Sequence, residues 1–436
     1  MTASSGAEVI QSGRMGMGQW VAIGVTVGLN ALDGFDVLSI SFASPGIARD
    51  WGIDRAVLGW ILSMELMGMA IGSLVLGGVA DRIGRRPTIL GSLVAMTIGM
   101  WGAGHAAGIG DLLGWRLLTG LGIGGMLAAL NAAAAECAND RWRSLAMALM
   151  VIGYPVGGIL GGLVVQTLLI DGGWRDIFQF GAIATACFIP LVWFLVPETV
   201  AYLERQQPRG ALDRINGTLS RFGHGRPINA LSRISQDAGQ SVADILRPGL
   251  IATTMLMTSA YFAHIISFYY VLKWVPKIVA DMGFDPSTAA GVLTWANVGG
   301  ASGGALFGLM ALRLGLKPLT MAALAGSFVM IVWFGLSARS LDSLVVAVGC
   351  AGFFTNSAIV GLYSLFARVF PTHVRATGTG FAIGIGRGGS ALAPVAAGYL
   401  FQAGLGLGIV SVVMGAGSLL AIAALAMLRI SPAPQH

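Results

Sequence analysis

The chain has 436 residues, of which 55% are hydrophobic and only 11% are charged, and its mean hydropathy is +0.77. A soluble domain usually carries about 25% charged residues, so this composition excludes a globular protein of the cytosol. The net charge of +6 does not indicate a nucleic-acid partner, because the basic residues gather in short segments between long apolar runs. We therefore expect a polytopic membrane protein that is embedded in the lipid bilayer.

Twelve apolar runs are long enough to cross a bilayer, since a membrane-spanning helix needs about 20 apolar residues. In chain order they cover residues 18–40, 55–80, 87–107, 110–136, 143–170, 175–196, 248–279, 286–311, 318–337, 341–366, 376–402 and 405–428. Most of the 26 Lys and Arg residues lie in every second loop, on one side of the membrane. By the positive-inside rule this side is the cytoplasm, and both termini lie on it. The short polar N-terminus does not read as a cleaved signal peptide, so we expect none.

A polar and basic segment at residues 198–247 divides these spans into six and six. We interpret it as a cytoplasmic connector between an N-terminal bundle, residues 1–197, and a C-terminal bundle, residues 248–436. The halves echo each other, because GGVADRIGRRP at 77–87 aligns with GLMALRLGLKP at 308–318. Such a repeat predicts two pseudo-symmetric six-helix bundles. In transporters built from repeats, the substrate site lies near the midplane between them.

The first span contains two carboxylates in the stretch Leu-Asp-Gly-Phe-Asp. Asp33 and Asp36 are three residues apart, so they lie on neighbouring faces of one helix. Burial and a neighbouring like charge both disfavour the ionised form, and a carboxylate tuned in this way can take up and release a proton. One acid is then a proton carrier while the other contacts substrate or tunes its neighbour; alternatively, one only satisfies local polar groups. Gly34 leaves room for a substrate or for a helix.

Further charged residues lie within the predicted spans. Arg387 is twelve residues beyond Arg375, too deep to reach the interface, so its guanidinium needs an anion. A substrate carboxylate fits its forked donors, and a permanent protein counter-ion is the alternative. Glu65 in the second span is a third acid, which pairs with either Arg116 of the fourth span or Lys273. Lys273, near the outer end of the seventh span, either draws an organic anion inward or contacts lipid headgroups.

Polar and aromatic side chains of the C-terminal half are candidates for contacts with a substrate. His264 in the seventh span occupies the place that Asp33 has in the other half. It either hydrogen-bonds a ring hydroxyl of the substrate, relays a proton, or only packs against its neighbours. Aromatic residues surround it, among them Tyr269, and they suit stacking on an aromatic ring as well as core packing. The remaining candidates for a polar lining are Asn297, Asn356 and Tyr363.

The loop between the second and third spans reads Gly-x-x-x-Asp-Arg-x-Gly-Arg-Arg at residues 77–86. It resembles the motif that marks the major facilitator superfamily at this position. The stretches LDGFDVLSISFASPGI, ANVGGASGGALFG and FPTHVRATGTGFAIGIGRGG resemble the aromatic acid:proton symporter family, although Lys273 replaces the small polar residue expected there. The resemblance implies the major facilitator fold, in which the loop gates the cytoplasmic side. The gate residues are then Asp81, Arg82, Arg85, Glu136 and Arg375.

The fourth span begins with GWRLLTGLGIGG, which resembles the superfamily's fourth-span motif. In that motif the arginine faces an acid of the first span, so the resemblance implies an Asp36–Arg116 pair. Together with Asp33, this pair is our prediction for proton coupling, and a permanent structural ion pair is the alternative. The resemblance also implies that Arg387 is essential, and binding of a substrate carboxylate there is our inference from its depth.

The sequence therefore predicts a transporter that imports a benzoate- or hydroxycinnamate-like acid together with protons by alternating access, and not an enzyme. No phosphate-cradling or metal-ligand pattern occurs, so we expect neither ATP use, nor a cofactor, nor a metal. The expected partners are the small acid, protons and the lipid of the inner membrane, and we expect no nucleic-acid partner. We expect the protein to function as a monomer. The alternatives are a symporter for another organic acid or a sugar, a proton-coupled exporter of drugs or metabolites, and a receptor without transport.

Overall fold

The computed structural model describes residues 5–224, 227–231, 242–337, 340–371 and 374–428, and the regular elements in these ranges are helices. Twelve of them are long, and each overlaps one predicted span, which confirms the all-helical membrane fold. They are α2 (Met17–Trp51), α3 (Arg55–Ile83), α4 (Arg85–Gly104), α5 (Ile109–Cys137), α6 (Arg143–Asp171), α7 (Trp174–Leu195), α11 (Ile251–Asp281), α12 (Pro286–Met310), α13 (Leu316–Leu336), α14 (Leu341–Val369), α15 (Arg375–Gln402) and α16 (Leu407–Met427).

Among the described residues, ten of these helices are both long and apolar enough to cross a membrane, and α12 and α15 are not in that group. Both are long enough, but glycine and small polar residues lower their hydropathy. These residues also permit close packing: a Cβ added at Gly303 of α12 would overlap the main-chain carbonyl of Phe353 on α14. Low hydropathy here accompanies tight helix contact.

Four short helices complete the described elements: α1 (Gly6–Ser12), α8 (Val200–Gln206), α9 (Ala211–Arg221) and α10 (Val242–Ile245). The last three belong to the predicted connector at 198–247, of which residues 225–226 and 232–241 lie outside the described ranges. The connector is thus more than an extended link between two bundles, because α8 and α9 pack on each other and on α1.

The chain forms two compact units. Unit 1 contains the described parts of 1–37, 68–157 and 178–239, and unit 2 contains those of 38–67, 158–177 and 240–436. Four helices, α2, α3, α6 and α7, contribute one part to each unit. The division of the chain into bundles at 1–197 and 248–436 stays a prediction.

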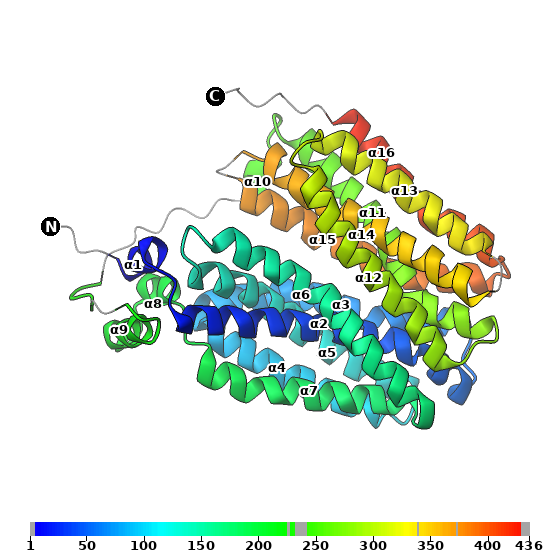
Figure 1. The fold of residues 1–436 in the computed structure, drawn as a ribbon, viewed down its shortest axis with the longest axis horizontal. Helices are drawn as coiled ribbons and strands as arrows, with labels where there is room; N and C mark the ends of the chain where they lie inside the picture. Colours follow the sequence, from blue (N-terminus) through cyan, green and yellow to red (C-terminus); the bar gives the residue numbers. More distant parts are fainter. Residues whose placement is uncertain (1–4, 225–226, 232–241, 338–339, 372–373, 429–436) are drawn as a thin grey trace. The chain divides into compact units, whose positions relative to one another are not determined.

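In unit 1, α4 runs along α5, and α1, α8 and α9 gather beside the start of α2 (Figure 1). An apolar cluster fixes this group of short helices, including Ile10 of α1, Ile23 of α2, Leu203 of α8 and Leu219 of α9, each at most 2% exposed. Burial of such side chains stabilises the group by about 1.5–3 kcal/mol each, as an upper estimate. The amphipathic pieces of the connector therefore have a definite place.

In unit 2, α11 packs on α15, α12 on α14, and α13 on both α14 and α16. Its core lies where α11, α13 and α14 meet, and includes Tyr261, Leu324, Phe366 and Phe307. Polar residues of α11, α14 and α16, among them His264, Thr355 and Ser418, interrupt this core.

Candidate functional site

The predicted proton-coupling residues lie together inside unit 1. Asp33 and Asp36 on α2 are 1% and 0% exposed, and Arg116 on α5 is 0% exposed. The Nη2 atom of Arg116 donates to the main-chain carbonyl of Asp36 at 3.2 Å, and Nη1 lies 3.0 Å from Sδ of Met100. The guanidinium also lies over the ring of Phe178, 5.2 Å from its centroid. The structure thus brings Arg116 against the turn of α2 that carries both acids.

Gly34 explains how the acidic turn of α2 is held. A Cβ at this position would overlap the main-chain carbonyl of Tyr154 on α6, and a Cβ at Gly157 would overlap that of Ala31. The main chains of α2 and α6 therefore touch directly. Of the two uses predicted for Gly34, the structure shows the approach of a helix.

The junction of α3 and α4, which the sequence predicted as a loop, carries a chain of ion pairs in unit 1. The Nη1 atom of Arg85 lies 3.0 Å from Oδ1 of Asp81, and its Nη2 atom lies 3.2 Å from Oε1 of Glu136. Arg205 of α8 also reaches Oδ1 of Asp81, at 3.1 Å. Arg85 is 7% exposed, so its charge is largely withdrawn from water and depends on these partners. Asp81, Arg85 and Glu136, which we predicted as gate residues, are in one network.

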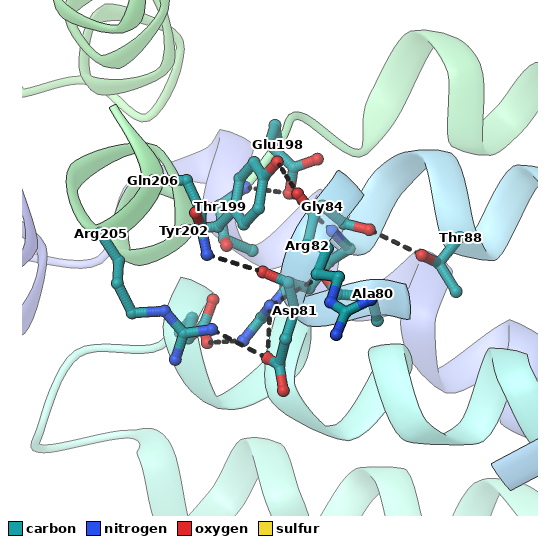
Figure 2. Close-up of polar contacts among 12 residues, drawn as sticks. Ala80, Asp81, Arg82, Gly84, Thr88, Glu198, Thr199, Tyr202, Arg205 and Gln206 are labelled. Atoms are coloured by element: carbon teal, nitrogen blue, oxygen red, sulfur yellow. Dashed lines mark hydrogen bonds and ion pairs between the residues drawn. The ribbon is translucent and has the colours of Figure 1, made fainter. Parts of the chain in front are cut away.

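Glu198 ties this loop to the connector through main-chain groups (Figure 2). Its carboxylate accepts hydrogen bonds from the amides of Arg85 at 3.0 Å, Arg86 at 3.3 Å and Thr199 at 3.0 Å. Burial raises the pKa of Glu198 above its ordinary value, and the three amide donors act in the opposite direction. Gly84 has φ of 111°, and a side chain there would collide with Glu198. The carboxylate therefore caps the start of α4 from outside the helix.

Three residues of α8 reinforce this connection, and sequence reasoning missed all three together with Glu198. The hydroxyl of Tyr202 donates to the carbonyl of Arg82 at 3.0 Å, and Nε2 of Gln206 donates to the carbonyl of Asp81 at 3.0 Å. Arg205 supplies the ion pair to Asp81. The amphipathic pattern of the connector was the available signal that this segment would pack.

The other two predicted gate residues have different surroundings. The side chain of Arg82 is exposed, and its described contact is the main-chain bond from Tyr202. Arg375 begins α15 in unit 2, where its Nε atom donates to the carbonyl of Phe370 at 3.4 Å. A role for these two residues in gating stays a prediction.

His264 is fully buried in unit 2, and protein groups contact both of its ring nitrogens. Nδ1 lies 3.0 Å from the hydroxyl of Ser418, and Nε2 lies 2.9 Å from the carbonyl of Thr355. Ser418 in turn bonds to Ser327 at 3.1 Å. Since neither nitrogen is left for a ring hydroxyl, His264 in this structure joins α11, α14 and α16, which is the packing alternative.

The candidate residues around Arg387 form an aromatic and polar group in unit 2. The hydroxyl of Tyr261 lies 3.0 Å from that of Tyr363, which is 38% exposed. The ring of Tyr261 also packs on Gly386, next to the half-buried Arg387. Tyr269 is half-buried, with its ring edge-on to Phe268 at 5.3 Å. The guanidinium of Arg387 interacts electrostatically with Tyr261, and a cation near phenols suits an anionic aromatic molecule.

The two asparagines predicted to line the site lie on neighbouring helices, Asn297 on α12 and Asn356 on α14. Nδ2 of Asn356 donates to the carbonyl of Gly300 at 2.6 Å, which joins the two helices. Asn297 is 5% exposed, donates to Leu293 of its own helix at 3.1 Å, and lies against Gly158 of α6. Both side chains retain an amide oxygen as a further acceptor.

The structure decides between the two partners that the sequence allowed for Glu65. Its Oε2 atom lies 3.6 Å from Nζ of Lys273, and both side chains are 0% exposed. Lys273 is therefore buried among helices in this structure, and not placed at lipid headgroups. In the described ranges, no group of three His, Cys, Asp or Glu side chains is arranged to hold a metal ion.

Comparison with known proteins places this geometry in a family. The sequence profile of the Major Facilitator Superfamily matches residues 26–274, more than half of the chain. The chain belongs to the major facilitator superfamily. The fold agrees, because the crystal structure of a D-xylose–proton symporter superposes with a TM-score of 0.75 at 17% identity, covering 95% of this chain and 98% of that one.

Curated members of the superfamily resemble this chain over almost its full length. A gallate transporter of Pseudomonas putida is 30% identical over 95% of this chain and 94% of its own. A 3-(3-hydroxy-phenyl)propionate transporter of Escherichia coli (strain K12) is 29% identical over 93% of each chain. A benzoate transport protein of Acinetobacter baylyi is 27% identical over 91% of this chain and 86% of its own. This facilitator is therefore a multi-pass membrane transporter and not an enzyme.

Proposed function

We propose that this transporter imports an aromatic carboxylic acid, benzoate- or hydroxycinnamate-like, together with protons. One observation carries the proposal: relatives that match over nearly the whole chain transport gallate, benzoate and 3-(3-hydroxy-phenyl)propionate. These compounds share one aromatic ring and one carboxylate. The buried charges of the spans support it, because ionisable groups at membrane depth mark ion and substrate pathways.

In this proposal the coupling and binding roles fall to different residues. Asp36 carries the proton with Asp33 beside it, and Arg116 holds the ionised form. Arg387 and Tyr363 contact the acid from α15 and α14, and the polar lining is completed by Tyr269, Asn297 and Asn356. Two six-helix bundles rock to expose this site alternately, and the network of Asp81, Arg85 and Glu136 latches the cytoplasmic side. The protein acts as a monomer in the inner membrane, with both termini in the cytoplasm.

Proton movement in liposomes tests the proposal. The purified protein is reconstituted with a pH-sensitive dye inside, and gallate, benzoate, 3-(3-hydroxyphenyl)propionate and aliphatic acids are added singly. We expect acidification of the lumen with one or more ring-bearing acids, beyond that of protein-free liposomes, and its loss in Asp36→Asn. Silence with every ring-bearing acid contradicts the aromatic assignment.

The same assay separates the alternatives. A response to aliphatic acids alone identifies a symporter for another class of organic acid. Proton movement in the opposite sense, driven by a substrate on the inside, identifies an exporter. Neither alternative has an observation here that favours it over an aromatic acid.

A further inference from the structure

The buried Glu65–Lys273 pair is one of two ion pairs, here called the ladder, between α11 and the antiparallel first part of α3, residues 55–67, both in unit 2. At the outer end, Nη2 of Arg55 on α3 lies 3.2 Å from Oδ2 of Asp281 on α11. Ten residues further along α3, Glu65 meets Lys273, which lies eight residues before Asp281. At 1.5 Å per residue, Glu65 is about 15 Å and Lys273 about 12 Å below the outer pair. The inner pair is therefore close to the middle of a hydrocarbon core of about 30 Å.

The chemistry of this pair is that of a carboxylate-binding site. An ion pair that is buried on both sides is a poor way to hold two helices, because the cost of removing both charges from water offsets their attraction. The ammonium of Lys273 offers a compact charge with three donors, and the group that it contacts is a carboxylate. A transported acid presents the same functional group as the Glu65 side chain.

A cavity lies at the outer end of the ladder, beside the Arg55–Asp281 pair. Its volume is about 510 Å³, and Arg55, Asp281, Trp274 and Phe401 are among the residues that line it. The volume lies within the range of small-molecule sites, and two aromatic rings form part of the wall. Trp274 directly follows Lys273 on α11, so the cavity reaches the turn of the helix that carries the ammonium.

The charges at the outer end of the ladder favour an anion. Arg55 and Lys277 both pair with Asp281, which leaves one positive charge in excess. Positive charge around a cleft raises the local concentration of anions. An aromatic acid can therefore be drawn in by its carboxylate while its ring packs on Trp274 or Phe401.

We propose that Lys273 binds the carboxylate of the incoming acid, and that Glu65 is the counter-ion that the acid replaces. This inference rests on the proposed function and adds to Arg387 a second cation, which the carboxylate meets first as the acid enters. In the proposed alternating-access mechanism, α3 belongs to the predicted N-terminal bundle and α11 to the predicted C-terminal bundle, so the two helices separate when the site opens outward. Glu65 then leaves with α3, and the ammonium of Lys273 faces the arriving carboxylate.

Equilibrium binding to the full-length protein in detergent tests this assignment. The probes are radiolabelled gallate, benzoate and 3-(3-hydroxyphenyl)propionate, and each is displaced either by the same acid or by its neutral amide. Wild type should prefer acid to amide strongly. Lys273→Gln should weaken acid binding by roughly 30-fold or more and abolish this preference, because a desolvated charge partner is lost. Glu65→Gln should bind the acid more tightly and the amide unchanged, because the internal competitor is gone.

Two further variants keep the test decisive. Lys317→Gln, at the start of α13 where the ammonium donates to the main-chain carbonyl of Leu428, is the matched control and should change acid affinity by less than about threefold. Glu65→Gln combined with Lys273→Gln preserves shape without a buried charge, so it folds even where Lys273→Gln alone does not. It should bind the acid as weakly as Lys273→Gln.

The outcomes separate this inference from the proposed function. If the double variant binds the acid like wild type, the pair is structural and the assignment of Lys273 is wrong. Retention of the acid-over-amide preference by a folded Lys273→Gln overturns it as well, while acid-driven proton movement by wild type leaves the proposed function standing. If wild type binds none of the three acids, both the inference and the aromatic assignment fail.

Discussion

Replacing Gly34 by Ala should push α2 and α6 apart at the acidic turn. The atoms that a Cβ would meet there are main-chain atoms of Tyr154, which cannot rotate away as a side chain can. Overpacking of this kind costs about 1–3 kcal/mol. Because the obstacle is a helix backbone, we take the upper end of that range, and the better helix propensity of Ala returns about 1 kcal/mol. The expected loss is therefore about 2 kcal/mol.

Gly24 is the matched control on the same helix, since a Cβ at this position meets nothing within 4 Å. Gly24→Ala should gain up to about 1 kcal/mol from helix propensity, so the two variants should differ by about 3 kcal/mol. With an unfolding entropy of about 2.1 cal/mol/K per residue, this corresponds to a Tm difference of roughly 3 °C for the whole chain.

Thermal unfolding in detergent, followed by tryptophan fluorescence, measures this difference, and acid-driven proton movement in liposomes measures its consequence. We expect Gly34→Ala to lose both stability and transport, since Asp33 and Asp36 flank the displaced residue. Gly24→Ala should retain both. Equal Tm values for the two variants would refute the argument that main-chain contact between α2 and α6 positions the acidic turn.

Three other changes test the remaining contacts. Arg85→Gln should destabilise the protein by about 1–3 kcal/mol, because Asp81 and Glu136 lose their shared cation. Arg141→Gln, in the exposed loop between α5 and α6, is the control and should leave Tm unchanged. Equal Tm values for the two variants would contradict this role of Arg85. His264→Ala should lower Tm without changing which acids inhibit uptake, and an altered inhibition profile would show that His264 contacts substrate. The folded pKa of Glu198 is raised, so docking of the connector is strongest below the ordinary pKa of 4.5 and weakens as pH rises through the folded value. Amide hydrogen exchange at residues 199–206, corrected for intrinsic rates, should therefore become faster as pH rises over this range. Glu198→Gln should remove this pH dependence.

Helix positions could be predicted from the sequence for two reasons. Backbone groups inside the bilayer must be hydrogen-bonded within the segment, which requires a helix, and side chains in lipid must be apolar, so each span is a long apolar run. The ends were less predictable. The first span was expected to end at residue 40, yet α2 continues to Trp51 and includes Pro45 and Arg49. Apolar length marks where a helix leaves the hydrocarbon, and it does not mark where its hydrogen bonding stops.

The site was predictable where it consists of charges inside apolar runs, and not where a partner is distant or belongs to the main chain. Glu65 was recognisable as unusual, but its choice between Lys273 and Arg116 depends on which helices are neighbours. Glu198 was missed because its partners are backbone amides at the start of α4. Every residue carries an amide, so no sequence pattern distinguishes the ones that a carboxylate will reach.

The proposed separation of proton coupling from anion binding has a thermodynamic consequence. Asp36 lies in unit 1 and Lys273 in unit 2, yet a symporter requires that the proton and the acid favour each other's binding by the same factor. Acid affinity should therefore fall as pH rises in wild type. Asp36→Asn, which mimics the protonated side chain, should bind the acid well at every pH, whereas Lys273→Gln should bind it poorly at every pH. If Asp36→Asn retained the wild-type pH dependence, the coupling proton would have to bind at another group, and the assignment of Asp36 would be wrong.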